Sequence, residues 1–302
     1  MADDHDYDII IAGAGAAGLS AALMLGRSKS RVLVISQKRR RNSTAAKVNN
    51  VPFAHGESPE AVYTKMERDA AEAGAQFVWD TIDAVSADDD RVTVETVHNG
   101  VYTARRLLLA TGRVDRLPSW LPSGIWGRTA FDCPYCHTFE NDGKDFAVIG
   151  NEGPNAVVMA RLAQAYARSM TVIVQSPEAV KAHPRAADLL QADGARIVID
   201  EVERADVLES GRLRLRTRGD VLHEADVLLL TEVPQPDHRF TAQLGLELNQ
   251  AGYPATDLNG RTSHPRVYSA GNALGSAYYM WTGAAASGLN AARAIWEDKV
   301  LK

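Results

Sequence analysis

The sequence predicts an α/β protein built from two Rossmann-like, three-layer domains. A strand, a glycine turn, a helix and a second strand follow one another within residues 8–35. A strand-to-helix pattern recurs at 144–163, and an apolar strand follows at 170–174. Strands that alternate with helices at this spacing are typical of βαβ units in a parallel sheet. With 302 residues and 45% hydrophobic content, the chain is long enough to build two such domains.

The first unit reads DIIIAGAGAAGL from residue 8 and carries the spacing Gly13-x-Gly15-x-x-Gly18. In this context the glycines indicate a dinucleotide-binding turn. Gly13 permits the tight turn, Gly15 lets the backbone approach a pyrophosphate, and Gly18 allows the helix to pack closely on the strand. The helix that begins near Ala16 and Ala17 would direct its N-terminus at the phosphates. A glycine-rich turn without a ligand is the alternative.

The end of the second strand carries Ser36 and Gln37, at the point where an acidic residue usually binds the adenosine ribose. The basic run 38–41 follows them. Such a run could hold a 2′-phosphate and indicate NADP, whereas a solvated charged loop explains the same residues. These residues alone leave the identity of the nucleotide open.

The second unit has a damaged glycine turn. Gly150 is followed by Asn151, Glu152 and Gly153, which do not keep the GxGxxG register. Glu152 stands where close approach of a phosphate requires glycine and no negative charge. After the next strand, residues 175–178 contain no arginine pair for a 2′-phosphate. We therefore expect the shape of a nicotinamide domain without its phosphate chemistry.

Cys133 and Cys136 are the two cysteines of the chain, in the segment CPYCH. If Cys136 lies in the first turn of a helix, the two sulfurs can close a small disulfide, and the helix N-terminus lowers a thiol pKa. A zinc site would need further ligands, and two inert buried thiols would serve packing alone; both are alternatives to a redox pair. His137 can take a thiol proton near neutral pH, and a surface or capping role is its alternative.

Charge and hydropathy exclude several partners. The net charge of −5 does not indicate a basic surface that would attract nucleic acid or an anionic membrane. The N-terminus lacks the pattern of a secretory signal, and no apolar stretch approaches the ~18 residues of a membrane span. We therefore expect a cytoplasmic location, where a stable structural disulfide is unusual. This favours a catalytic role for the cysteine pair, without a metal.

Four segments occur in the order seen in low-molecular-weight thioredoxin reductases. They are the glycine turn 13–18, the strand 107–112 (LLLATG), the CxxC that leads into the second Rossmann unit, and 267–272 (VYSAGN). The chain resembles that family over nearly its whole length. The resemblance implies FAD at the first site and an FAD-binding domain made of 1–116 and 246–302. It also implies an inserted Rossmann-like domain at 117–245 that carries the CxxC, and a homodimer.

The resemblance also implies which residues bind the cofactor. Besides the glycine turn with Ala16 and Ala17, these are Ser36, Gln37, Arg41, Asn42, Asn50, Ala110, Thr111, Gly112, Gly271, Asn272, Met280 and Trp281. The loops at 41–42 and 49–52 could equally be plain loops. Asn272 replaces the family's usual Asp at the flavin ribityl chain and keeps a hydrogen-bonding group without the charge. Residues 279–281 would present an aromatic surface to a small heteroaromatic substrate, or would pack as core residues against the flavin.

The histidine after the second cysteine, where the reductases usually carry Asp, resembles a subgroup of the family. This subgroup is the dithiol oxidases that form the disulfides of the natural products gliotoxin, holomycin and romidepsin. The resemblance implies an FAD-dependent enzyme that oxidises a small-molecule dithiol to an intramolecular disulfide and returns the electrons to O2 as H2O2. It further implies that Cys133 exchanges with the substrate and Cys136 passes electrons to the flavin. A disulfide reductase fed by NADPH or another donor is the alternative, and a flavin-binding redox sensor is a third.

Overall fold

The structure of the chain is a computed structural model that describes residues 7–150, 155–231, 233–275 and 280–301. It divides into two compact units, each with its own core. The first unit is Met1–Ser43, Glu57–Val114 and Pro236–Lys302, and the second is Thr44–Gly56 and Asp115–Gln235. The boundaries at 114/115 and 235/236 fall within β7 (Arg113–Asp115) and β16 (Pro234–Pro236), which pair with each other. In these ranges we find no helix with the length and apolar character of a membrane span.

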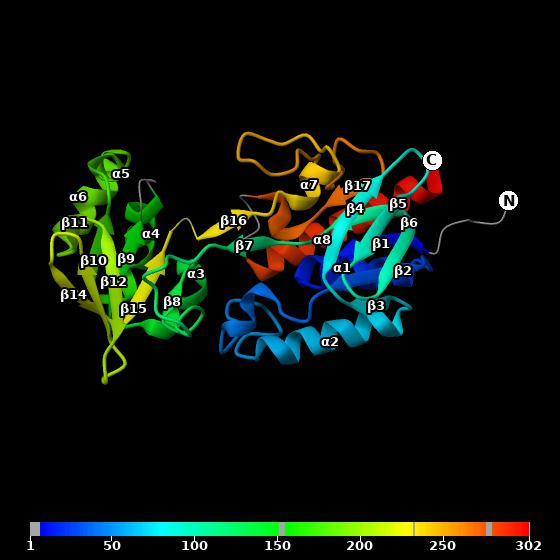
Figure 1. Cartoon of the computed structure of the whole chain (residues 1–302). Coiled ribbons are helices and arrows are strands. Elements are labelled where there is room, and N and C mark those ends of the chain that lie inside the picture. Colours follow the sequence, from blue (N-terminus) through cyan, green and yellow to red (C-terminus); the bar gives the residue numbers. More distant parts are fainter. Residues whose placement is uncertain (1–6, 151–154, 232, 276–279, 302) are drawn as a thin grey trace. The chain divides into compact units, whose positions relative to one another are not determined.

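Seven of the described strands form one sheet in the first unit (Figure 1). Its parallel part has the order β3 (Gln76–Trp79), β2 (Val32–Ser36), β1 (Tyr7–Ala12), β6 (Gly100–Leu109) and β17 (Val267–Ser269). β17 pairs with the carboxyl-terminal half of β6. The amino-terminal half of β6 pairs with β5 (Val92–Thr96), and antiparallel β4 (Ile82–Ala87) follows at the edge. The carboxyl ends of β1, β6 and β17 therefore meet at one edge of the parallel part.

Helices cover one face of the parallel part of this sheet, and the antiparallel strands β4 and β5 pack with the short helix α7 against its other face. α1 (Ala16–Arg27) packs between α8 (Trp281–Leu301) and α2 (Pro59–Glu72). The approach of α8 to α1 is close, because a β-carbon on Gly288 would lie 2.1 Å from the carbonyl oxygen of Ala17. On the opposite face, Phe240 of α7 (Arg239–Gln243) joins apolar residues of β4 and β5 in a second core. The unit thus has three layers.

The second unit also has three layers. Its parallel sheet has the order β11 (Arg196–Ile199), β10 (Ala167–Val174), β9 (Lys144–Gly150), β15 (Val227–Leu230) and β8 (Ala130–Phe131). One face packs on α4 (Asn155–Ala163), α5 (Pro177–Lys181) and α6 (Pro184–Ala192). The other packs on an antiparallel sheet of β12 (Val202–Val207), β13 (Leu213–Thr217) and β14 (Leu222–Ala225). Alternate residues of β9 enter the two cores, as expected for a strand buried on both faces.

Short helices complete the described chain. They are α3 (Pro134–His137) and four 3-10 helices, η1 (Arg41–Thr44), η2 (Phe139–Asn141), η3 (Gln164–Tyr166) and η4 (Gly271–Leu274). The predicted α/β class with two Rossmann-like, three-layer domains is confirmed. The predicted domain boundaries at 116/117 and 245/246 stay a prediction. The damaged glycine turn falls on residues 151–154, which lie outside the described residues.

Candidate active site

The glycine turn after β1 needs two of its three glycines for steric reasons. Gly13 has a φ of +112°, and a β-carbon there would lie 2.4 Å from the carbonyl oxygen of Ala110. A β-carbon on Gly18 would lie 1.9 Å from the carbonyl oxygen of Gly13. Gly15 differs, because it precedes α1 as its N-cap and a β-carbon there would meet no atom within 4 Å. Open space therefore lies before the α1 N-terminus, where backbone N–H groups favour an anion.

Two further predicted segments lie beside this turn. The Ala110 N–H donates to the Ala12 carbonyl at 2.9 Å, so residues 110–112 leave β6 next to the turn. Gly271 has a φ of +70°, and a β-carbon on it would lie 2.9 Å from the β-carbon of Ala17. The buried Oδ1 of Asn272 has no hydrogen-bond partner among the described residues. A buried acceptor without a donor fits a ligand hydroxyl such as that of a ribityl chain.

Arg40 stabilises the glycine turn through a hydrogen bond to its backbone, a role that the sequence did not reveal. Its Nε donates to the carbonyl oxygen of Ala14 at 3.1 Å, and its guanidinium forms an ion pair with Glu67 of α2. The guanidinium also lies over the rings of Tyr63 and Trp79, 4.9 and 5.4 Å from their centroids. Arg40 is therefore neither a solvated loop residue nor free to hold a 2′-phosphate. Glu67 lies 27 residues further along the chain, so no local pattern could have indicated the pair.

The other predicted cofactor residues lie in several elements, most of them in the first unit. Ser36 Oγ donates to the Gln37 carbonyl at 2.9 Å, and Gln37 Nε2 donates to Thr81 Oγ1 at 2.9 Å, both near the end of β2. Arg41 and Asn42 lie in η1 of the first unit. Met280 and Trp281 are half-buried at the start of α8, where Trp281 packs on the core beneath α1. Tyr279 lies outside the described residues. Asn50 belongs to the second unit, and its place at the cofactor stays a prediction.

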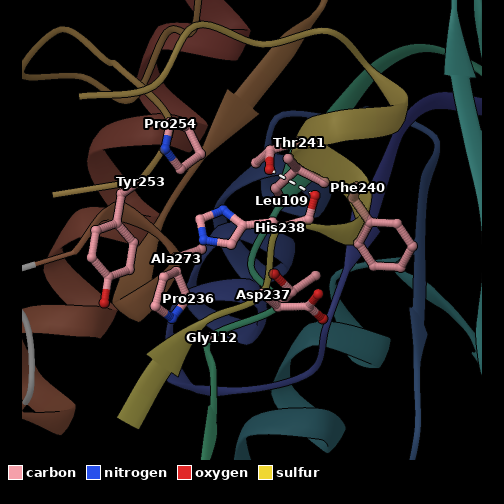
Figure 2. A pocket seen from close by; sticks show the side chains of 12 residues that line it. Leu109, Gly112, Pro236, Asp237, His238, Phe240, Thr241, Tyr253, Pro254 and Ala273 are labelled. Carbon is pink, nitrogen blue, oxygen red and sulfur yellow. Dashed lines mark hydrogen bonds between the residues drawn. The ribbon is translucent and has the colours of Figure 1, made fainter. Parts of the chain in front are cut away.

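A small pocket lies beside the carboxyl end of β6 in the first unit (Figure 2). Thr111 and Gly112 line it together with His238 and Tyr253. Figure 2 shows the backbone oxygen of His238 accepting a hydrogen bond from Thr241 Oγ1, at 2.9 Å. The cavity measures about 10 Å³, which is room for about one water molecule. It can hold a solvent molecule next to the predicted cofactor segment, but no substrate.

Cys133 and Cys136 form a disulfide with a Cα–Cα distance of 5.4 Å. Cys133 is the N-cap of α3, and Cys136 lies in that single turn, with its N–H donating to the Cys133 carbonyl at 3.3 Å. The preceding strand β8 is held in register by β15. Both cysteines are half-buried. Within the described ranges, no group of three or more His, Cys, Asp or Glu side chains is placed to hold a metal ion.

His137 directly follows Cys136 and is the last residue of α3, and its role as a base stays a prediction. Its half-buried ring stacks on the ring of Phe131, with 4.0 Å between centroids and 20° between planes. Burial lowers the pKa of His137 below its usual 6.5, while the charges of Glu140 and Asp132 act in the opposite direction. The net shift of the pKa is downward, and this favours the neutral imidazole, the form that accepts a proton.

Asn49 contacts the disulfide turn. Its Nδ2 donates to the carbonyl oxygen of Cys136 at 3.0 Å. The sequence pointed to residues 49–52 only as a loop that passes the flavin. The structure instead groups residues 44–56 with the second unit. No sequence signal links Asn49 to Cys136, because the two are 87 residues apart.

Comparison with known proteins identifies the family. The model of the pyridine nucleotide-disulphide oxidoreductases matches residues 7–288. The chain belongs to this family. Pyridine nucleotide-disulphide oxidoreductases of this type are FAD-binding flavoproteins, and FAD is the cofactor of this chain, as predicted. The open face at Gly15 and the unpaired acceptor of Asn272 fit that cofactor.

Individual relatives cover almost the whole chain. The chain is 30% identical to the thioredoxin reductase sirT of Leptosphaeria maculans, over 88% of this chain and 86% of that protein. It is 27% identical to the 34.2 kDa protein in the rubredoxin operon of Clostridium pasteurianum, over 97% of both. The crystal structure of HlmI superposes with a TM-score of 0.85 at 29% identity, and covers 97% of this chain and 92% of that one. The chain is therefore a thioredoxin-reductase-like disulfide oxidoreductase.

Proposed function

We propose that this chain is an FAD-dependent dithiol oxidase that converts a small-molecule dithiol into an intramolecular disulfide, with O2 as the final acceptor. The observation that carries the proposal is the half-buried Cys133–Cys136 disulfide in the single turn of α3, followed directly by His137, whose pKa burial lowers. The family membership supports disulfide chemistry with FAD. The resemblance of the CPYCH segment to the oxidases of gliotoxin, holomycin and romidepsin supports the direction of the reaction.

The thiol chemistry follows from the disulfide. A substrate thiolate attacks Sγ of Cys133, the Cys133–Cys136 bond breaks, and the bonding electron pair remains on Sγ of Cys136. The second substrate thiolate then attacks the substrate sulfur of the mixed disulfide and releases Cys133 as a thiolate. The substrate has lost two electrons and two protons, and the enzyme pair has gained the electrons. His137 takes one of the two protons that the substrate thiols lose.

FAD, when bound, would accept the two electrons of the reduced cysteine pair, and O2 with two protons would receive them as H2O2. The balanced reaction is therefore dithiol plus O2 to disulfide plus H2O2. Glycine at positions 13 and 18 lets the turn pack closely on the backbone of residues 110 and 13, and the α1 N-terminus would hold the pyrophosphate.

The alternative is a disulfide reductase fed by NADPH, as the thioredoxin reductase name of the sirT relative suggests. The residues after β10 argue against it. Ser176 caps α5 by accepting from the Glu178 N–H at 3.0 Å, and its hydroxyl donates to the Glu178 carboxylate at 2.8 Å. A carboxylate at this position repels the 2′-phosphate that an NADPH site must hold. A cytoplasmic location and a homodimer stay predictions.

Oxygen consumption tests the proposal. The purified holoprotein is mixed with dithiothreitol in air, without NADPH, while O2 uptake and H2O2 are measured. We expect one O2 consumed and one H2O2 formed for each dithiol oxidised, and no such uptake with Cys133→Ser. Absence of O2 uptake unless another acceptor is supplied would contradict the oxidase assignment.

A further inference from the structure

Residues 48–56, here called the recognition loop, form a closed loop within the second unit. The Gly56 N–H donates to the Val48 carbonyl at 2.9 Å, and the Ala54 N–H donates to the Val51 carbonyl at 3.1 Å. Val48 and Val51 are buried, with exposed fractions of 5% and 3%. Loops whose ends meet and whose own side chains pack them are compact elements that often carry function. The loop is therefore built to hold its remaining residues in place.

Phe53 is the unusual residue of the recognition loop. Its side chain is fully exposed, and its φ is +69°. A bulky side chain at positive φ is a backbone outlier, and such outliers gather at sites of function. Burial of the ring does not explain the conformation, because the ring is buried against nothing in the structure. The loop thus exposes an apolar ring to the solvent, although the backbone conformation at Phe53 is energetically unfavourable.

The recognition loop is tied to the disulfide. Asn49 donates to the Cys136 carbonyl at 3.0 Å, and the four residues from Asn49 to Phe53 span at most about 14 Å. Two more exposed aromatic side chains flank the cysteines, Tyr135 with 61% and Phe139 with 72% exposure. Among the described residues, only one other aromatic side chain is exposed, Trp296 of α8. Three of the four exposed aromatic side chains of the described residues therefore belong to the cysteine turn or to the loop that is hydrogen-bonded to it.

We propose that Phe53, Tyr135 and Phe139 form an aromatic surface that binds a planar, apolar ring carried by the dithiol substrate. The proposal rests on the proposed oxidase function and names the class of its substrate. Aromatic rings bind one another in offset or edge-to-face pairs, and short rigid side chains lose little entropy on contact. Residues 132–140 contain two carboxylates and no lysine or arginine. The surface therefore suits a neutral or cationic ring compound and disfavours an anionic one.

Two dithiols with the same spacing between their sulfurs test the surface. Both 1,2-benzenedimethanethiol and dithiothreitol close six-membered cyclic disulfides, but only the first carries a benzene ring. The holoprotein, Phe53→Ala and the control Leu222→Ala are compared by kcat/KM for each dithiol. Leu222 is a matched control because it is also an exposed apolar residue of the second unit, on β14. The measured quantity is the ratio of kcat/KM for the aromatic dithiol to that for dithiothreitol.

We expect Phe53→Ala to lower this ratio by about three- to tenfold, the effect of losing one aromatic contact. Phe53→Trp should keep the ratio, and Leu222→Ala should not change it. An unchanged ratio in Phe53→Ala, with normal O2 uptake, overturns the aromatic surface and leaves the oxidase function standing. If Phe53→Ala lowers kcat/KM for a reduced thioredoxin-like protein but for neither small dithiol, the small-molecule occupant is overturned.

Failure of the oxidase function gives a different result. The rate at which each dithiol opens the Cys133–Cys136 disulfide is then measured without O2, by trapping the released protein thiols. If O2 uptake is absent but Phe53→Ala still slows opening by the aromatic dithiol selectively, the surface stands and the oxidase function does not. If the variant opens equally fast with both dithiols, the surface is refuted.

Discussion

Gly15→Ala should separate cofactor binding from folding. The backbone at Gly15 has φ −82° and ψ −174°, which alanine adopts without strain. A β-carbon there meets no atom within 4 Å. Alanine is a poorer N-cap than glycine by up to about 1 kcal/mol, and the loss of unfolded-state freedom returns about 0.4–1 kcal/mol. The unfolding free energy of the apoprotein should therefore change by less than about 1 kcal/mol.

Gly18→Ala is the matched comparison. Its β-carbon would lie 1.9 Å from the carbonyl oxygen of Gly13 and 3.2 Å from Cγ2 of Ile11. Backbone must move to admit it, which costs about 1–3 kcal/mol or more. This variant should destabilise the apoprotein, whereas Gly15→Ala should not.

The methyl group of Gly15→Ala enters the space before the α1 N-terminus, where the pyrophosphate of FAD is expected. An overpacking cost of about 1–3 kcal/mol there raises the Kd for FAD by about 5- to 150-fold. The assay is titration of each apoprotein with FAD, followed by flavin fluorescence, beside thermal unfolding of the apoproteins. The reasoning is refuted if Gly15→Ala binds FAD with the Kd of the unmodified protein, or if its apoprotein is as unstable as that of Gly18→Ala.

Three further outcomes follow from the disulfide site. Cys133→Ser and Cys136→Ser should each abolish dithiol oxidation while the protein keeps its FAD spectrum; full turnover in either would remove the thiol relay. Because burial lowers the pKa of His137 and its neutral form is the base, the fall of kcat/KM that is due to His137 should lie below pH 6.5, separate from the ionisation of the substrate thiols; His137→Ala should slow turnover at neutral pH and lose this limb. Glu140→Gln removes a charge that raises the pKa of His137, so the acid limb should move to lower pH, and a shift to higher pH would contradict the assignment.

Local patterns predicted the cofactor turn because its determinants are local. The apolar run of β1, the glycine at position 13 with positive φ and the alanine-rich start of α1 lie within a few residues of one another. The same holds for the disulfide, since the spacing of Cys133 and Cys136 places both in one helical turn. Segments 110–112 and 271–272 came from the family resemblance, and the structure brings them to the turn.

The contacts that the sequence missed join distant parts of the chain. Arg40 reaches both Ala14 and Glu67, and Asn49 reaches Cys136. An arginine in a basic run and an asparagine in a loop carry no periodicity, so their partners depend on the tertiary fold. Phe53 was likewise hidden, because a single aromatic residue in a sequence does not reveal whether it will be buried.

The central claim is that electrons enter this flavoprotein from a dithiol and not from a nicotinamide. Anaerobic mixing of the holoprotein with dithiothreitol and, separately, with NADPH tests it most directly through the loss of oxidised-flavin absorbance. We expect rapid bleaching of the flavin by the dithiol and none by NADPH, with the colour restored when air is admitted. Bleaching by NADPH at the rate of turnover, with the dithiol leaving the flavin oxidised, would contradict it.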